Sequence, residues 1–450
     1  MGRYRLPVVA ISAAVALAGS ARAAEVTRVA TAADPGNPID VDFSIRWDRF
    51  QKTGLISREW DVGGSIEDLA QLRFTQKATA LVPRVAVGIY RDLELHAEIP
   101  YVLADDMRWR YALVGGIPVG GTSWDTIENN DVTPSGDPCL PAGSCPLFPV
   151  GNGTTVYHGG KAGDLLVGAA WAILSEERDD TKPKWVVGLD VTFPTAELYD
   201  PAAGRFDRPD WSSPHVNAAN PGPFGQKLWR FDLSTALSRR MGPFDPYVRA
   251  HLTVQRKAAQ TYSNCDNALA LESPPPPTPP LPQGPSWMYE NCAGFDESSA
   301  ARPPYLVGLL FGAEVIPYEN AAAGQKVAID VRLSADYTSV ARWYNELTDA
   351  SGRIHWTEDY ATVSALFGLH LKASNFVALR AEASIGTQTA HAITGESLGR
   401  LRGEDPGPPY DETNTALNPN FDWRYDSPGR RFRVSEVSLF DVRVTGILRF

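Results

Sequence analysis

The residues with the greatest chemical capability are charged side chains that recur at alternate positions along the chain. In the stretch 39–48, the acids Asp40, Asp42 and Asp48 and the base Arg46 alternate with apolar residues. A period of two places the charged residues on one face of an extended strand and the apolar residues on the other. Carboxylate and guanidinium groups on one wall set a field for passing solutes, so this pattern favours a polar passage over covalent chemistry.

The same arrangement recurs in later segments. The polar faces present groups of both charge signs, which are our candidates for the lining of a pore: Asp40, Asp42, Arg46, Asp48, Glu94, His96, Glu98, Asp190, Arg230, Asp232, Arg249, His251, Glu314, Asp330, Arg332, Asp336, His370, Lys372, Arg380 and Glu382. Two interpretations stay open. Either these residues line a water-filled passage, or they pair across the interior and close it.

The histidines argue against an enzyme. Three of the seven, His96, His251 and His370, fall on polar faces, and the others lie in connections or at strand ends. A lipid-cleaving Ser–His pair would need a histidine on an apolar face, and the chain has no Gly-x-Ser-x-Gly sequence. It also lacks cysteine and histidine spacings typical of zinc. We therefore expect no enzyme activity, no metal site and no cofactor.

The elements that carry these residues are predicted to be twelve strands. Alternation places them at about 39–50, 70–90, 93–105, 163–175, 184–195, 227–240, 247–257, 304–316, 326–343, 357–372, 376–388 and 433–450. Short turns alternate with long connections at about 106–158, 197–226, 259–303, 344–356 and 389–432. The rhythm and the even count indicate an all-β fold, a transmembrane antiparallel up-and-down β-barrel with short periplasmic turns and long extracellular loops. The alternative, a secreted soluble sandwich or barrel, predicts shorter strands.

The N-terminus is predicted to be an export signal that spans residues 1–23. Arg3 and Arg5 precede a short apolar core, and Ala21-Arg22-Ala23 fits a cleavage site. Residues 24–38 then form a short periplasmic segment, and 39–450 form the barrel. Export permits disulfides. Of the three connectivities that four cysteines allow, we expect the local one, which closes the shortest loops: Cys139 with Cys145 and Cys265 with Cys292.

Composition excludes two other classes. The chain has 42 Lys and Arg against 53 Asp and Glu, a net charge of −11, and loss of the three arginines of the signal makes the remainder −14. A protein this acidic lacks the basic face that nucleic acid requires. After the signal, no apolar run approaches the ~20 residues that a membrane-spanning helix needs.

The end of the chain carries a further signal. Phe440, Val442, Val444, Leu448 and the terminal Phe450 share one face of the last predicted strand. A final strand that ends in Phe resembles the signal by which outer-membrane barrels are recognised, so we expect Phe450 to contact the barrel-assembly machinery.

Three motifs in the first half support a family resemblance. They are Val87-Gly88-Ile89-Tyr90-Arg91-Asp92-Leu93-Glu94-Leu95 with Ile99-Pro100-Tyr101, then Gly160-Lys161-Ala162-Gly163-Asp164-Leu165 with Gly168 and Trp171, then Pro183, Gly188 and Phe193-Pro194-Thr195. In this order they resemble the outer-membrane family named for the meta-pathway of phenol degradation, over about residues 81–196. Ala196 stands where the family has glycine. The resemblance implies an outer-membrane channel, and weakly implies transport of hydrophobic or aromatic compounds.

We therefore expect a bacterial outer-membrane channel through which small solutes pass passively, selected by pore width and by the charge of the lining. Its expected partners are outer-membrane lipid and lipopolysaccharide, the assembly machinery and the solute. A structural or surface-interaction barrel with a closed lumen is the alternative. Only about 15 residues precede the first strand, so no large N-terminal plug is expected. Any constriction should come from inward-folded loops, with 106–158 as the best candidate.

Overall fold

The computed structural model describes residues 24–32, 39–62, 64–114, 117–118, 155–201, 221–264, 300–397, 418, 420–421 and 426–450. The predicted export signal and all four cysteines lie outside these residues, as does most of the connection 106–158. The predictions made for them therefore stay predictions.

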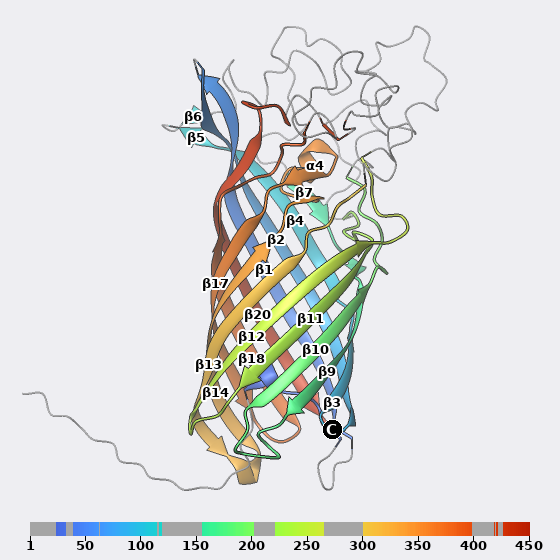
Figure 1. The fold of residues 1–450 in the computed structure, drawn as a ribbon, viewed down its shortest axis with the longest axis vertical. Coiled ribbons are helices and arrows are strands. Elements are labelled where there is room, and N and C mark those ends of the chain that lie inside the picture. Colours follow the sequence, from blue (N-terminus) through green and yellow to red (C-terminus); the bar gives the residue numbers. More distant parts are fainter. Residues whose placement is uncertain are drawn as a thin grey trace, which may run out of the picture.

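Twelve antiparallel strands of the described chain close into a barrel (Figure 1). The first two are β1 (Val41–Val62) and β2 (Ser65–Tyr90). The third is interrupted into β3 (Leu93–Glu98) and β4 (Tyr101–Tyr111), and the fourth into β7 (Thr155–His158), β8 (Lys161–Ala162) and β9 (Leu165–Leu174). The others are β10 (Lys184–Phe193), β11 (Leu228–Ser238), β12 (Phe244–Lys257), β13 (Leu306–Asn320), β14 (Gln325–Thr338), β17 (Tyr360–Lys372), β18 (Val377–Gln388) and β20 (Phe432–Arg449).

Each barrel strand pairs with its neighbours in the chain, and β20 pairs with β1 from Asp42↔Arg449 to Arg58↔Phe432. This seam leaves no open edge, and the expectation of an all-β up-and-down barrel is confirmed. The C-terminus lies at the end opposite α4 (Thr348–Ser351), together with the short turns (Figure 1). We call these two ends the short-turn end and the long-loop end.

The remaining described elements are small. The 3-10 turn η1 (Glu25–Thr27) precedes β1, and η3 (Ala321–Ala323) connects β13 to β14. The short strands are β5 (Leu113–Val114), β6 (Ile117–Pro118), β15 (Ala341–Trp343), β16 (His355–Thr357) and β19 (His391–Ala392). Among the described residues, no helix has the length and apolar character needed to cross a membrane.

A belt of exposed apolar side chains surrounds the barrel. It includes Ile45, Val85, Leu95, Leu189, Leu233, Leu252, Leu309, Val331, Leu333, Val363, Phe367, Leu379, Ile385, Phe440 and Val444. Exposed aromatic residues form two groups. One lies near the short turns, at Tyr90, Trp171, Trp185, Tyr318, Phe376 and Phe450, and the other lies toward the long-loop end, at Tyr101, Tyr305 and Tyr337. An apolar band between two aromatic girdles is the surface that a barrel presents to lipid.

The strands differ from the prediction mainly at the long-loop end. The strand predicted at 39–50 continues to Val62, and its partner begins at Ser65 and not near 70. The pattern hides this extension, because a bulge at Ile56/Ser57 shifts the alternation. The strand predicted at 326–343 ends at Thr338, and β15 belongs to a separate two-stranded sheet with β16.

A hydrophobic core fills the barrel at the long-loop end. Its buried members come from β1, β2, β4, β20 and the connections between strands: Ile56, Leu72, Phe74, Met107, Trp109, Leu347, Ala350, Ile393, Phe432, Val434 and Val437. Alternation with polar residues does not predict an apolar interior, so this core is a departure from the expected polar lumen.

Candidate functional site in the barrel interior

The segment 24–32 lies inside the barrel at the short-turn end (Figure 1). Its contacts run around the wall: Glu25 accepts a hydrogen bond from Arg380 of β18 at 2.8 Å, and the Thr27 hydroxyl lies 2.7 Å from that of Ser238 of β11. The Ala30 amide donates to Glu94 of β3 at 2.7 Å. The expectation that only loops could narrow the lumen is therefore wrong. A segment of nine residues needs no fold of its own when the wall satisfies its polar groups.

Several predicted lining residues bind this segment. Asp42 forms an ion pair with Arg28, and Asp40 accepts a hydrogen bond from the Thr31 amide at 3.4 Å. Glu94 is also held by Arg84 of β2 at 2.6 Å. The segment thus shields part of the polar wall from water at this end.

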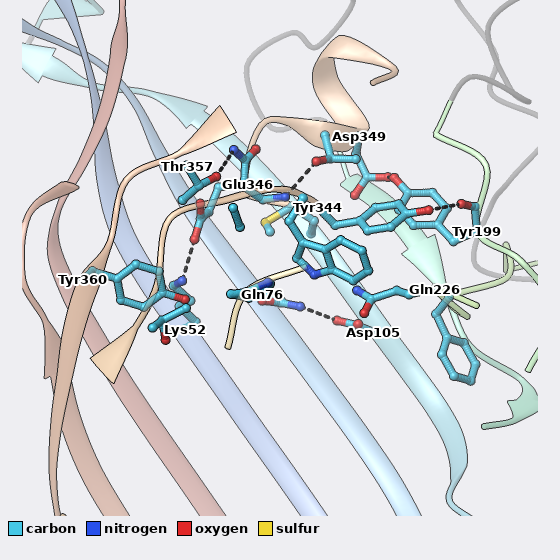
Figure 2. Close-up of a pocket in the computed structure, with 18 of the residues that line it drawn as sticks. Lys52, Gln76, Asp105, Tyr199, Gln226, Tyr344, Glu346, Asp349, Thr357 and Tyr360 are labelled. Atoms are coloured by element: carbon cyan, nitrogen blue, oxygen red, sulfur yellow. Dashed lines mark hydrogen bonds and ion pairs between the residues drawn. The ribbon is translucent and has the colours of Figure 1, made fainter. Parts of the chain in front are cut away.

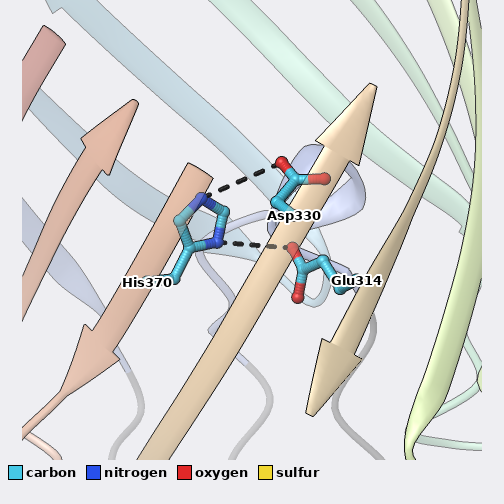
Figure 3. A group of neighbouring side chains, drawn as sticks. All are labelled: Glu314, Asp330 and His370. Carbon is cyan, nitrogen blue, oxygen red and sulfur yellow. Dashed lines mark ion pairs between the residues drawn. The ribbon is translucent and has the colours of Figure 1, made fainter. Parts of the chain in front are cut away.

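Beside the segment lies a buried cluster of Glu314, Asp330 and His370 (Figure 3). The imidazole Nδ1 lies 3.5 Å from Glu314 Oε1, and Nε2 lies 3.9 Å from Asp330 Oδ2. These three residue types can ligate a metal. However, Lys326 Nζ already lies 3.2 Å from Glu314, and Arg332 Nε donates to Asp330 at 2.6 Å. The carboxylates are therefore already bound to cations, and the geometry is that of an ion-pair network.

A glycine lets His96 and Asp190 meet although they are two strands apart. Gly168 of β9 is the register partner of both residues. A Cβ on this glycine would lie 2.0 Å from Asp190 Oδ1 and 2.4 Å from His96 Nε2. Without it, the two side chains cross above β9, with Nε2 and Oδ1 2.9 Å apart.

The same geometry recurs further round the barrel. Gly308 of β13 is the register partner of His251 and Asp336, whose Nε2 and Oδ1 lie 3.5 Å apart. Sequence patterns do not reveal such pairs, because the partners come together only through the register of three strands.

A third glycine, Gly368 of β17, lies in register between Asp330 and Glu382. Here Arg332 bridges the two acids, since its Nη2 donates to Glu382 at 2.6 Å while its Nε binds Asp330. Four of the predicted lining residues, counting His370, thus form one network on β14, β17 and β18.

The other predicted residues are less connected. Arg46 donates to Asp48 at 2.9 Å, Asp232 accepts from Thr253 at 2.5 Å, and Lys372 donates to Asn375 at 3.1 Å. In the part of the chain that the structure describes, three candidates have neither an ion pair nor a hydrogen bond from the side chain: Glu98, Arg230 and Arg249.

At the long-loop end, the segment 341–357 folds into the mouth of the barrel. Glu346 forms a buried ion pair with Lys52 of β1, and its carbonyl accepts a hydrogen bond from the Trp109 indole at 3.1 Å. Leu347 and Ala350 pack into the hydrophobic core. The sequence predicted an inward-folded loop and named 106–158 as the best candidate. The inward-folded loop that the structure describes is a different one, which covers the predicted connection 344–356 and its flanks.

A cavity of about 240 Å³ lies beside this loop (Figure 2). One wall is aromatic: the Tyr199 and Tyr344 rings lie 5.0 Å apart, and the Trp343 ring lies 5.1 Å from Tyr344. Gln76 and Asp105 also line the cavity, and their side chains are joined by a 2.8 Å hydrogen bond. A cavity of about 150 Å³ is large enough for benzene, so this one is large enough for a monocyclic aromatic solute.

Two ionisable groups in the loops around the cavity have shifted pKa values. Burial and the neighbouring Asp349 carboxylate raise the pKa of Tyr199 well above its ordinary value. Burial alone would raise the pKa of Glu346, but the Lys52 ammonium outweighs it and lowers that pKa. At neutral pH, Tyr199 therefore stays a hydrogen-bond donor to Asp349 and Glu346 stays charged.

The sequence patterns did not identify the residues of the mouth or of the segment 24–32. Lys52 and Asp105 lie beyond the stretches of clean alternation, and Glu346 and Tyr199 lie in connections. Arg84 lies on the same face of β2 as the buried Val82 and Ala86. Its sequence signal is that it is the one charged residue in the otherwise apolar run 80–87.

The closed barrel, its outward apolar belt and its charged interior define a transmembrane β-barrel of the bacterial outer-membrane class. No known protein family and no curated protein matches the chain. The resemblance to the phenol meta-pathway family therefore stays a prediction.

Solved barrels are similar over most of the chain. An outer-membrane channel from Pseudomonas putida F1 aligns over 93% of this chain and 99% of its own, with 11% identity and a TM-score of 0.40. A FadL homologue from Pseudomonas aeruginosa aligns over 91% and 90%, with 8% identity and a TM-score of 0.32. The outer-membrane protease OmpT from Escherichia coli aligns over 92% and 96%, with 8% identity and a TM-score of 0.27. Similarities this weak say nothing about substrate or activity.

Proposed function

We propose that this protein is an outer-membrane channel for small uncharged organic solutes, with aromatic solutes as the preferred class. The observation that carries the proposal is the aromatic-walled cavity inside the mouth of a closed barrel. Aromatic rings bind one another in tilted and edge-on arrangements, which is how Tyr199, Tyr344 and Trp343 already pack. A solute that enters from the outside therefore meets a matching surface first.

Below the cavity, the charged wall acts as a filter. Several of the predicted lining residues form ion pairs with one another, so that part of the wall carries fixed dipoles more than free charge. Such a wall hydrates a narrow passage and opposes ions more than neutral solutes. The segment 24–32 closes the short-turn end in the described conformation, and passage requires it to move. No covalent step or cofactor enters this mechanism.

The assignments of partners and sidedness belong to the same proposal. The short turns face the periplasm, the long loops and their acidic residues face lipopolysaccharide, and Phe450 is read by the assembly machinery. The Phe450 ring is exposed, and its backbone pairs with Val41 at the seam of the barrel, at 2.9 and 3.0 Å. This location makes the residue accessible while the last strand is still unpaired.

Current recordings in a planar bilayer test the channel. We expect ionic conductance, interrupted by brief blocks when benzyl alcohol is added, and fewer blocks with n-propanol at the same concentration. Trp343→Leu should shorten the blocks, because it removes one of the three rings of the aromatic wall. Absence of conductance from the intact chain and from a chain without residues 24–32 would instead support a structural barrel with a closed lumen.

A further inference from the structure

The start of the segment 24–32 is held deep in the barrel. Ala24 is fully buried, and the amide of Glu25 donates to Glu314 Oε1 at 2.6 Å. The carbonyl of Ala24 accepts hydrogen bonds from the amide and the hydroxyl of Thr27, both at 3.0 Å. The wall therefore binds the residue that directly follows the expected cleavage site.

A buried carboxylate without a partner lies next to this point. Asp245 of β12 is fully buried, and both of its carboxylate oxygens are without a hydrogen bond in the described structure. It is the register partner of Glu314 across the β12–β13 ladder. A buried carboxylate without a counter-ion or a hydrogen bond is strongly unfavourable, so this site calls for a cation.

The nearby cations are already committed. Lys326 binds Glu314, and the guanidinium of Arg240 binds Glu319. A third carboxylate in the neighbourhood, Glu176, accepts hydrogen bonds only from the backbone amide of Arg240 among the described residues, at 3.2 Å. The surroundings of Asp245 therefore hold more acids than free bases.

The chain itself supplies the missing cation if the export signal is cut after Ala23. Hydrolysis of that peptide bond adds a hydroxyl to the Ala23 carbonyl and leaves an amine on Ala24, which takes up a proton. Successive backbone nitrogens lie about 3.6 Å apart in an extended chain, and Ala24 is extended, with ψ 147°. The new ammonium therefore lies within about 6 Å of the Glu314 carboxylate, whose register partner across the ladder is Asp245.

We propose that Asp245 and Glu314 form a binding site for the α-ammonium group of Ala24, which exists only after cleavage. An ammonium has three donors, enough for both carboxylates and one carbonyl. In the uncut chain, the same nitrogen is a neutral peptide N–H, and Asp245 has no counter-ion. Cleavage of the signal thus completes the site and locks the segment 24–32 into the barrel.

The experiment compares two forms of the mature chain that differ in one charge. Chains that begin at Ala24 are refolded with either a free or an acetylated α-amine, and heat-dependent gel mobility confirms folding of both. Hydrogen exchange of residues 24–32 is the readout. We expect exchange at least tenfold faster in the acetylated form. Equal exchange in both forms would overturn the proposal, as would sequencing of the exported protein that finds a first residue other than Ala24.

Asp245→Asn separates this role from a merely structural one. In the free-amine chain it should speed exchange, and in the acetylated chain it should slow exchange, because it removes the unpaired charge. Asp180→Asn, in the turn between β9 and β10, is the matched control and should change neither form. An equal effect of Asp245→Asn on both forms would also overturn the proposal. None of these measurements depends on conductance, so their results test this proposal independently of the channel proposal.

Discussion

At the scale of single residues, the interior contains ion pairs whose side chains point inward from the barrel wall. The Lys52–Glu346 pair is the clearest case, since it ties the mouth loop to β1 with both side chains largely buried. Removal of one partner of a buried ion pair commonly costs about 3–5 kcal/mol, because the other charge stays buried and unpaired. The pair therefore holds the mouth loop in place more than it selects solutes.

This pair predicts a loop that loosens in acid. The Lys52 ammonium keeps the pKa of Glu346 below its ordinary value in the folded protein. The unfolded chain therefore takes up the proton first, so the stabilisation is full above a pH of about 4.5 and is lost as the pH falls through the lower folded value. The protection factors of the backbone amides 344–351, which correct exchange for its intrinsic pH dependence, should fall below this pH. Glu346→Gln should exchange quickly at every pH, and an equal acid response in that variant would contradict the assignment.

The glycines between His–Asp pairs give a second prediction at this scale. Gly168→Ala places a methyl 2.0 Å from Asp190 Oδ1 and must displace the 2.9 Å contact with His96. We expect a loss of about 1–3 kcal/mol in unfolding free energy, measured from the urea midpoint of the refolded barrel. Gly446→Ala is the control, because a Cβ there meets nothing within 4 Å. Equal urea midpoints for the two variants would show that displacing the His96–Asp190 contact does not lower the unfolding free energy.

At the scale of elements, the last strand combines two roles. Its sequence closes the barrel against β1, and its final residue leaves an aromatic ring exposed at the seam. If Phe450 is an assembly signal, Phe450→Ala should reduce the amount of folded barrel in the outer membrane while the purified chain refolds normally. Phe440→Ala removes a similarly outward ring from the same strand and should reduce it far less. Poor refolding of the Phe450 variant in vitro would indicate a stabilising role instead.

The elements also show how far sequence patterns reach. Alternation predicted all twelve strands of the described barrel, because lipid on one side and water on the other leave a period of two wherever a strand crosses the apolar belt. It failed above the belt, where β1 and β2 continue as a hairpin with a hydrophobic inner face. In this hairpin the inner face is apolar and the outer face is no longer in contact with lipid, so apolar residues no longer mark the outward face of the barrel.

The candidate site was predictable only in part, for a related reason. Alternation predicts that His96, Asp190 and Glu382 share the polar face, but it cannot predict which of them meet. Their contacts depend on register across three strands and on a glycine at the crossing. Asp164 of the family-like motif is the exception. The motif singles out this residue in the sequence, and its carboxylate accepts a 2.8 Å hydrogen bond from the amide of Ala196.

At the scale of the whole molecule, the barrel is obstructed at both ends. The mouth loop narrows the long-loop end, and the segment 24–32 lies inside the short-turn end. The two obstructions differ in the balance of their contacts, since the loop adds buried apolar side chains to its ion pair with Lys52, whereas the segment relies more on charges and hydrogen bonds. Salt should therefore weaken the segment's contacts more than the loop's.

This asymmetry predicts which obstruction limits the current. A refolded chain that begins at residue 33 loses Glu25 and Arg28 and exposes their partners Arg380 and Asp42 to water. We expect it to conduct at least several-fold more than the intact chain in a planar bilayer, because the segment that lies inside the short-turn end is gone. Raising salt should increase the normalised conductance of the intact chain, but not of the shortened one, since only the intact chain has charge pairs that hold a plug. Unchanged conductance in the shortened chain would place the limiting constriction at the mouth loop, where Trp343→Leu would then have the larger effect.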